Sequence, residues 1–320
     1  MTAHKQTRHW AQINEVSFVA GMRLLFTVYR LCGRLPFRLM LYPVLCWYIA
    51  ANGRARRASR AYLLQVQAYR PGLCLPAGIG GVFRHFAAFG ESLLDKMLLW
   101  GGLFRTDRVT LRDQEHIAAA VEQGRGGLII CTHLGNLELC RVMGRDHPEV
   151  KLTVLVHTKH AQAFNRMLAQ LDPRSQLNLM QVTDMSPATA MMLADKVAQG
   201  EFVVIAGDRI PVSPNPRVAR AAFMGRSAPF PVGPYVLASL LRCPVYLMFS
   251  RRTAQGAEVS FEFFRDLVEL PRKQRDQRLD ELAADYAARL EFHCLQAPFQ
   301  WFNFYDFWAD SALDDQHVPH

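Results

Sequence analysis

The sequence predicts an α/β fold in which a mixed, largely parallel central sheet is flanked by helices and follows a helical N-terminal region. Three observations support this prediction. From Val109 onward, short apolar runs alternate with amphipathic segments, a pattern typical of a layered α/β domain. The segments between the runs are long enough to be crossover helices, which make strands parallel. Half of the 320 residues are hydrophobic, enough for a sizeable core.

The N-terminal region, residues 1–105, carries apolar residues at helical spacing. Its first eight residues are polar and basic, and no short apolar core leads from them to a cleavage site, so we expect no cleaved signal peptide. Four helical segments are predicted, over Trp10–Cys32, Leu39–Ala51, Arg54–Tyr69 and Gly78–Gly102.

The run Leu39–Ala51 is the densest apolar stretch of this region. A bilayer-spanning helix needs about twenty apolar residues, whereas this run has thirteen residues and contains Pro43. The combination of basic flanks and terminal aromatic residues predicts a segment that lies in, or dips into, an anionic membrane surface. A buried helical hairpin is the alternative, which explains the apolar residues but not the arginines. The flanking residues are Arg34, Arg38, Arg54, Arg56, Arg57 and Arg60, with the aromatic Trp47 and Tyr48.

The remaining residues, 106–320, are predicted to form the α/β domain, which we expect to pack with the N-terminal region as one unit. Strands are predicted over Val109–Leu111, Leu128–Cys131, Leu152–Val156, Leu177–Gln181, Phe202–Ala206 and Val245–Phe249, and an edge strand over Ala257–Phe264. Helices are predicted over Gln114–Gln123, Leu137–Arg145, Ala161–Leu171, Pro187–Gln199, Val232–Leu241 and Gln274–Leu295.

Composition narrows the classes of function. The 37 Lys and Arg residues against 28 Asp and Glu give a net charge of +9, which indicates an anionic partner such as nucleic acid or an anionic membrane. The arginines adjoin the most apolar part of the chain and no nucleic-acid reading motif, so we expect a membrane and no nucleic acid. The seven cysteines stand singly, which argues against a disulfide framework or zinc site. HExxH, GxSxG, P-loop and GxGxxG motifs are absent, and we expect no metal or cofactor.

The most informative stretch is GGLIICTHLGNLELCR, residues 126–141. The buried strand predicted over Leu128–Cys131 ends in a turn, after which Asn136 is placed to cap a helix. His133 and Glu138 lie on either side of this elbow, and Gly135 between them would let the carboxylate turn back and bond the imidazole. Such a dyad is a general base that takes a proton from an attacking hydroxyl.

Two alternatives apply to the same stretch. His133 could merely cap the strand end while Glu138 interacts with the helix dipole. Cys131, two residues before the histidine, is a second conceivable nucleophile, but it belongs to the apolar run and is expected to be core.

The segment HLGNLE, His133 to Glu138, resembles the His-x4-acid box of the bacterial lysophospholipid acyltransferase superfamily, and within it of the lipid A late acyltransferases. The chain has Leu137 where that family often has Trp. Further resemblances follow in the family's order, in Gly207-Asp208-Arg209, Phe223-Met224-Gly225, Cys243-Pro244-Val245 and the closing WFNFYDFW, Trp301 to Trp308, which is similar to a branch of predicted acyltransferases.

Polar residues after the predicted strands extend the candidate site, because ligands of open α/β sheets collect beyond the carboxyl ends of the strands. Arg209 would hold a phosphate of the donor or the acceptor. Asp208 would orient Arg209 or help to position the dyad, or the two would form an internal ion pair. The predicted substrate-binding residues are Asn136, Lys159, Asn165, Arg166, Asp208 and Arg209.

The resemblance implies a membrane-associated acyltransferase that moves a fatty acyl chain from an acyl carrier protein or CoA thioester to a hydroxyl or amine of a lipid acceptor. We expect it at the cytoplasmic face of the inner membrane, peripheral or monotopic. The acceptor stays open among a lysophospholipid, a lipid A precursor, an aminolipid and a polyene-type conjugate. The aromatic stripe Phe83, Phe86 and Phe89 would line an acyl channel or belong to the core. The rival functions are a non-catalytic lipid- or carrier-binding membrane protein and a lipid hydrolase.

Overall fold

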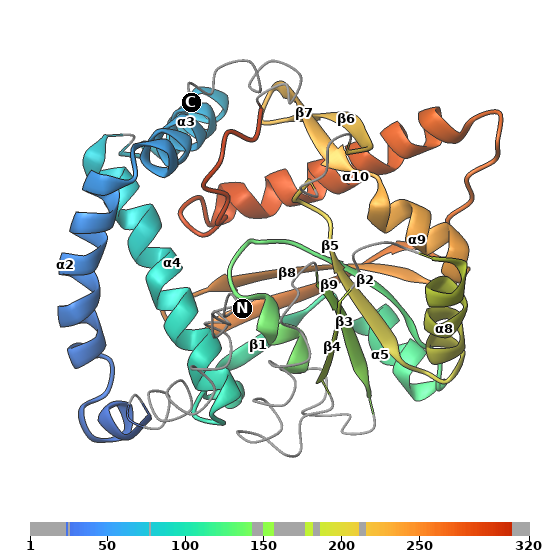
Figure 1. Cartoon of the computed structure of the whole chain (residues 1–320), viewed down its shortest axis with the longest axis horizontal. Coiled ribbons are helices and arrows are strands. Elements are labelled where there is room, and N and C mark those ends of the chain that lie inside the picture. The colour runs from blue at the N-terminus through green and yellow to red at the C-terminus, as the bar shows by residue number, and fades with distance from the viewer. Residues whose placement is uncertain are drawn as a thin grey trace, which may run out of the picture.

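The computed structural model describes residues 24, 26–76, 78–142, 150–156, 177–181, 186–210 and 216–308. A seven-stranded sheet with the order β1-β9-β8-β2-β5-β3-β4 lies at its centre (Figure 1). All neighbouring pairs in this sheet are parallel except β8 with β9. The predicted mixed, largely parallel α/β sheet is therefore confirmed. The strands are β1 (Val109–Arg112), β2 (Gly127–Cys131), β3 (Leu152–Val156), β4 (Leu177–Gln181), β5 (Phe202–Ala206), β8 (Val245–Arg252) and β9 (Ala257–Arg265).

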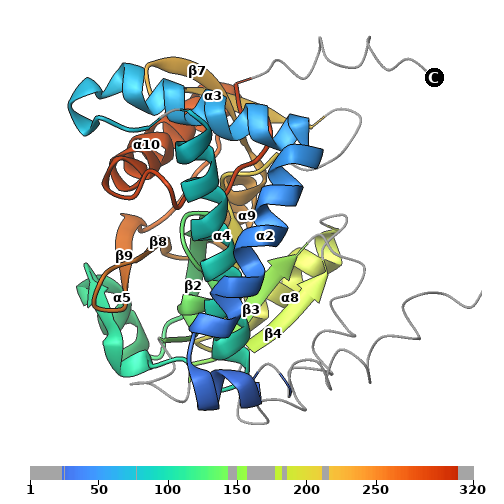
Figure 2. The ribbon, with the colours of Figure 1, turned by 90° about the vertical axis from the view of Figure 1, so that its left-hand side faces the viewer.

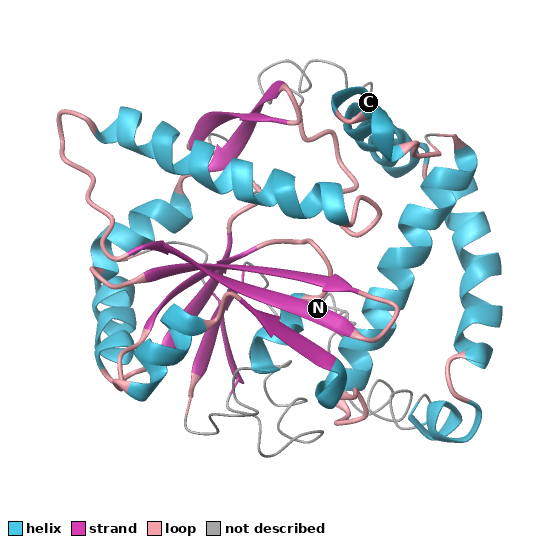
Figure 3. Ribbon diagram, turned by 180° about the vertical axis from the view of Figure 1, so that it is seen from behind, coloured by secondary structure: helices cyan, strands magenta, loops and turns pink. Residues whose placement is uncertain are grey.

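Helices surround the sheet, whose strands fan out because the sheet is twisted (Figure 3). Among them, α5 packs beside β9, α8 beside β5, α9 beside β2 and α10 beside β8. Within the described ranges, the helices of this part are α5 (Glu115–Glu122), α8 (Pro187–Ala198), α9 (Gly233–Leu241) and α10 (Arg275–Gln296), with the short 3-10 helices η2 (Thr106–Arg108) and η3 (Leu137–Val142).

The N-terminal helices form a separate layer at one side of the sheet. Helices α2 (Leu35–Ala51) and α4 (Ile79–Trp100) run side by side, and α3 (Gly53–Tyr69) crosses their ends (Figure 2). A short 3-10 turn, η1 (Pro71–Leu73), follows α3. The α2 helix begins after a turn at Gly33, continues through Pro43, and is capped together with α3 at Asn52, whose Oδ1 accepts the Ala55 N–H at 3.1 Å. Of the helices described here, none is long and apolar enough to cross a membrane.

The N-terminal layer shares a core with the sheet. Tyr62, Leu63 and Val66 of α3 belong to the same buried cluster as Tyr286 of α10 and Trp301 of the C-terminal segment. A second cluster fills the opposite face of the sheet, where α5 packs, and a third joins α2 to α4. Because α3 and the C-terminal segment meet in one core, residues more than 200 positions apart in the sequence are held together.

Three parts of the structure differ from the prediction. The Ala257–Phe264 strand is not an edge strand: β9 lies between β1 and β8, because the four-residue β1 pairs with its outer edge. Val259 and Phe261 on it are buried in the cluster that includes Ile117 of α5. The predicted helix from Leu137 is the 3-10 helix η3, which ends at Val142. The predicted helix over residues 161–171 lies outside the described part of the chain.

The structure also contains a hairpin that was not predicted from the sequence. Strands β6 (Val218–Phe223) and β7 (Arg226–Pro231) pair antiparallel and are joined by Met224 and Gly225, both with positive φ. Positive φ at both positions is typical of a type I′ hairpin turn. The Phe223-Met224-Gly225 segment is therefore the end of this hairpin, which packs on α10.

Candidate active site

The register of β2 and β5 brings the candidate catalytic residues together. Cys131 and Ala206, the last residues of the two strands, are paired, and the chains leave the sheet side by side with a Gly207 N–H to Cys131 O hydrogen bond of 2.9 Å. Two residues beyond each strand end lie His133 and Asp208. The predicted convergence of polar residues at one sheet edge is confirmed for this pair.

Asp208 holds His133 through both its side chain and its backbone. The Nδ1 atom of His133 lies 2.7 Å from Asp208 Oδ1, and the His133 backbone N–H donates to Asp208 Oδ2 at 2.7 Å. Because a carboxylate only accepts, Nδ1 carries the proton, and Nε2 is left with the lone pair that a general base uses. The His133 side chain is 20% exposed, so the imidazole is partly accessible.

The Asp208 carboxylate is fully buried yet charged. Burial alone would raise the pKa of Asp208, but the adjacent His133, the hydrogen bonds from it and the Trp301 N–H outweigh burial and lower that pKa below its usual value. The carboxylate therefore stays ionised next to the imidazole, the state in which it stabilises a positive charge on the ring.

Glu138 contacts a different partner from the predicted one. Its Oε1 lies 3.1 Å from Nζ of Lys96 on α4, while the acid that contacts the His133 ring is Asp208. The predicted hydrogen bond between His133 and Glu138 is not among the contacts of the described residues. The reason is local: η3 starts directly after the turn, with the Glu138 N–H bonded to Asn136 Oδ1 at 3.1 Å, and the acidic side chain is directed toward α4.

The elbow itself has the predicted glycine bend and asparagine cap. Gly135 has φ +65°, and a Cβ there would lie 2.3 Å from the carbonyl oxygen of Ser250. The Ser250 hydroxyl accepts the Asn136 N–H at 2.8 Å, and the Ser92 hydroxyl of α4 donates to Gly135 O at 3.1 Å. Only glycine fits this close approach in a left-handed conformation, so the position of His133 depends on it.

Asn136 is buried at the turn, and its Nδ2 has no hydrogen-bond partner among the described residues. Its carboxamide therefore keeps a free donor beside the elbow.

Arg209 is exposed and directed toward the C-terminal segment. Its Nε donates to Asn303 Oδ1 at 3.0 Å and its NH2 group to Phe302 O at 2.7 Å. The alternative of an internal Asp208–Arg209 ion pair is not observed among the described contacts, because the two side chains leave the loop toward different neighbours. Three other predicted residues, Lys159, Asn165 and Arg166, lie outside the described residues.

Cys131 is core, as predicted. It is 4% exposed, its Sγ lies 3.4 Å from Ile205 O, and burial raises its thiol pKa well above the usual value. A thiol that stays protonated is a poor nucleophile. The alternative of a cysteine nucleophile therefore loses its chemical basis.

Two residues with contacts to the site were missed in the sequence. Trp301 donates its indole N–H to Asp208 Oδ2 at 2.9 Å, and the Asn303 Nδ2 lies 3.4 Å from Asp208 O. Spacing carries no signal for contacts between segments more than 90 residues apart. The hints in the sequence were the family resemblance of WFNFYDFW, Trp301 to Trp308, and its mixture of aromatic residues with Asn and Asp.

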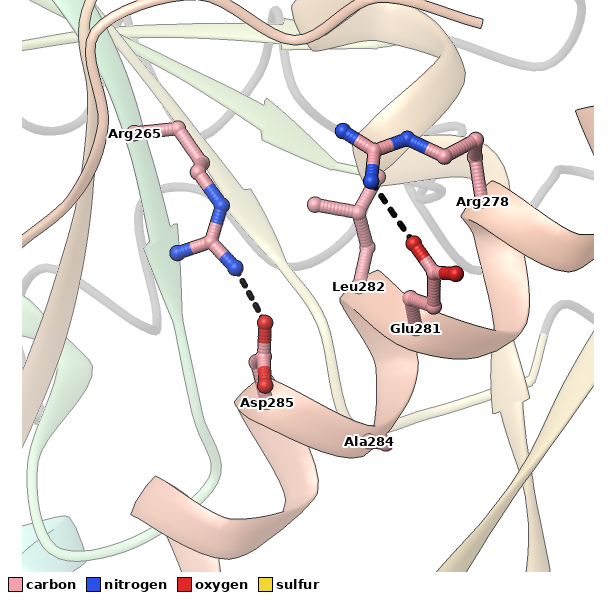
Figure 4. A pocket seen from close by; sticks show the side chains of 6 residues that line it. All are labelled: Arg265, Arg278, Glu281, Leu282, Ala284 and Asp285. Carbon is pink, nitrogen blue, oxygen red and sulfur yellow. Dashed lines mark hydrogen bonds and ion pairs between the residues drawn. The ribbon is translucent and has the colours of Figure 1, made fainter.

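A hollow between β9 and α10 is lined by none of the predicted site residues. Its basic residues already pair with acids, Arg265 with Asp285 and Arg278 with Glu281 (Figure 4). The hollow therefore supplies no candidate catalytic group.

Comparison with known proteins identifies the family of the chain. A family model described as bacterial lipid A biosynthesis acyltransferase matches residues 105–309, more than half of the chain. The match includes the elbow with His133 and Glu138, the Asp208 loop and the C-terminal segment with Trp301. No curated protein matches the chain. The protein belongs to the bacterial lipid A biosynthesis acyltransferase family.

Proposed function

We propose that the protein transfers a fatty acyl chain from an acyl thioester to a hydroxyl or amine of a lipid acceptor at a membrane surface. Membership in a family of lipid acyltransferases supports acyl transfer. The observation that carries the mechanism is the partly exposed His133 imidazole, whose Nδ1 is bonded to the buried, ionised Asp208. This pair is a general base at the carboxyl end of a parallel sheet, where substrates of such sheets bind.

In the proposed reaction, Nε2 of His133 takes the proton from the acceptor hydroxyl or amine as its oxygen or nitrogen attacks the thioester carbonyl. The positive charge that forms on the ring is stabilised by Asp208. When the tetrahedral intermediate collapses, the carbon–sulfur bond breaks and the leaving thiolate takes the proton from the ring. The acyl group passes directly to the acceptor, and no covalent acyl-enzyme is formed.

The His-x4-Glu box remains part of the proposal, but Glu138 now has a role other than orienting His133. Asp208 orients His133, whereas Glu138 and Lys96 form an ion pair between η3 and α4. Glu138 is buried and its partner is about one third exposed. We infer that this pair keeps the elbow fixed against α4.

The outer face of α2 supports a membrane location. Five large apolar residues on this helix are more than half exposed: Leu35, Leu39, Met40, Val44 and Trp47. Exposed apolar patches of this kind mark interaction sites. Arg54, Arg57 and Arg60, at the start of the next helix, are also exposed. An apolar face next to a basic one suits a helix lying in the plane of an anionic membrane, and we propose that α2 docks there.

The basic surface also suits the donor, because acyl carrier proteins and CoA are acidic. We propose either as the acyl donor and a membrane lipid as the acceptor. The exposed guanidinium of Arg209, next to the Asp208 loop, is proposed to bind an anionic group of one of them.

The test is transfer by the purified protein. Lipid vesicles are mixed with acyl carrier protein or CoA thioesters, and products are measured by mass spectrometry for the wild type and His133→Ala. Because the general base is lost, we expect transfer to fall about 10⁴-fold while vesicle binding is unchanged. Full transfer by His133→Ala would refute the mechanism. Release of free fatty acid without an acceptor would identify a hydrolase, and vesicle binding without turnover a non-catalytic protein.

A further inference from the structure

The C-terminal segment Gln300–Asn303 lies directly along the elbow that carries His133. The Gly135 N–H donates to Gln300 O at 2.8 Å and the Phe302 N–H to His133 O at 2.9 Å, so that Leu134 and Trp301 form an antiparallel bridge. On the other side, Arg252 of β8 exchanges hydrogen bonds with the Gln300 carboxamide at 2.6 and 2.9 Å. The segment is therefore held by hydrogen bonds to the elbow on one side and to β8 on the other.

This arrangement aims the Trp301 side chain at the acid of the site. Trp301 is 1% exposed, and its indole N–H donates to Asp208 Oδ2 at 2.9 Å, the same oxygen that accepts the His133 backbone N–H at 2.7 Å. The His133 ring donates to the other oxygen, Oδ1, so the carboxylate accepts three hydrogen bonds. Any rotation of the carboxylate would break at least one of them. An ionised acceptor makes each such bond stronger than a neutral one.

We propose that Trp301 is a positioning residue for acyl transfer: its indole N–H holds the Asp208 carboxylate in the orientation that fixes the tautomer and direction of the His133 ring. The inference rests on the proposed function and deepens it. It assigns the C-terminal segment to the active site.

The indole is itself held from several sides. Its ring packs against Tyr62, Phe223 and Phe307 at centroid distances of 5.1, 5.2 and 4.8 Å. The backbone oxygen of Trp301 lies 2.8 Å from Nε2 of the buried His85, and burial lowers the pKa of the His85 imidazole to about 4. Neutral His85 therefore donates to Trp301 and accepts from Ser59, whose Oγ lies 2.9 Å from its Nδ1. Helices α3 and α4 thus support Trp301.

Among the described residues, the other groups that face Asp208 carry no competing negative charge. Burial raises the pKa of Cys131, Tyr286, Cys294 and Tyr305 above their usual values, so these groups are neutral at physiological pH, and Arg209 is positive. Removing the indole N–H would therefore act on the carboxylate itself.

The test compares two tryptophans of the same segment. Trp308 is also buried, also packs on Phe223, and donates its indole N–H to Phe223 O at 3.3 Å, a contact outside the site. Trp301→Phe keeps an aromatic ring but removes the donor to Asp208, and Trp308→Phe is its matched control. For Trp301→Phe we expect kcat to fall roughly tenfold or more, as for a lost hydrogen bond to a charged group, with KM for the thioester unchanged. Trp308→Phe is expected to stay within about twofold.

The pH dependence of kcat distinguishes a positioning role of Trp301 from a role in packing alone. The acid limb of kcat reports protonation of the coupled His133–Asp208 pair. Loss of the donor leaves the Asp208 carboxylate more basic, which favours protonation of the pair, so the acid limb is expected to move to higher pH in Trp301→Phe and to stay in place in Trp308→Phe. Benzothienylalanine at position 301, which keeps the bicyclic shape and lacks the N–H, is expected to give the same shift and excludes a folding defect. Equal losses in both variants with unmoved limbs, or full activity of Trp301→Phe while His133→Ala is inactive, would overturn the inference. Full activity of His133→Ala would instead overturn the proposed function.

Discussion

The Asp208 carboxylate is bonded to His133 and Trp301, which come from distant parts of the chain, whereas the outer face of α2 presents large apolar side chains to the surroundings. Asp208 is 0% exposed, and Met40 on α2 is 75% exposed. The proposed function accounts for the difference. A general base needs fixed geometry, while a surface that takes up lipid must leave its apolar area uncovered by protein. Rigidity and exposure are therefore divided between the sheet edge and the helical layer.

The largest effect that would test this comparison is expected from Asp208→Asn. An amide cannot both accept from the His133 ring and stabilise its positive charge, so we expect kcat to fall about 10²- to 10³-fold. Steady-state kinetics with a thioester donor measures this effect.

The matched control for Asp208→Asn is Glu201→Gln. Glu201 is buried at the opposite end of β5 and pairs with Lys196 at 2.9 Å. This variant is expected to lower the melting temperature while keeping kcat. If both variants lose the same activity, the loss reports damage to β5 rather than the role of Asp208.

A smaller effect, on binding rather than chemistry, is expected from α2. In the double variant Leu39→Ser/Met40→Ser, the apolar area that would enter the bilayer is reduced. At about 1.5 to 3 kcal/mol for each buried side chain, we expect binding to anionic vesicles to weaken by roughly 100-fold or more. Turnover of water-soluble short-chain substrates should stay the same. Vesicle sedimentation measures the binding.

The control for the α2 variant is Met191→Ser, at a residue that is 69% exposed. It belongs to α8, the helix on the opposite side of the sheet from α2 (Figure 1). The control variant is expected to bind vesicles like the wild type. Equal binding by the α2 variant and this control would show that α2 does not face the lipid.

The smallest effect concerns the ion pairs that join the two regions. Glu91 of α4 contacts Arg34 at 3.1 Å, Arg252 of β8 at 2.6 Å, and Arg38. Burial would raise the pKa of Glu91, but the hydrogen bonds and charges of Arg38 and Arg252 lower it to about 2. Because this pKa is lower in the folded state than the value of about 4.3 in an unfolded chain, Glu91 contributes stability above that value, and the contribution is lost as the pH falls toward 2.

We therefore expect the melting temperature of Glu91→Gln to fall less steeply than that of the wild type between pH 4.5 and pH 2. Thermal denaturation across this range measures the difference. Glu115→Gln, at an exposed position on α5, is the control and should follow the wild type. Parallel curves for all three proteins would mean that the arginine contacts do not join the regions energetically.

Much of the local structure could be predicted from the sequence. The strands β3, β4 and β5 have the predicted bounds, because each is a run of strand length in which most residues are apolar. Gly135 was predicted to bend the elbow, and its φ of +65° confirms this. A left-handed backbone conformation between β2 and the Asn136 cap favours glycine. The placement of His133 and Asp208 at one edge followed from the rule that parallel strands end together.

The remaining features depend on contacts that no local pattern contains. Glu138 is five residues from His133, yet the acid that bonds the imidazole is Asp208, 75 residues away. Likewise, β9 reads as an edge strand in the sequence but is covered by β1, because strand order is set by how the sheet packs as a whole.

By itself, the sequence determined the fold class, most of the strands, the glycine-bent elbow and the histidine upon it, since these follow from side-chain periodicity and backbone preference over a few residues. Only the tertiary structure decided which carboxylate bonds that histidine and that Trp301, 93 residues beyond Asp208, bonds the carboxylate in turn. The physical reason is that a hydrogen bond forms wherever donor and acceptor meet in space, and packing of the whole core decides where distant segments meet.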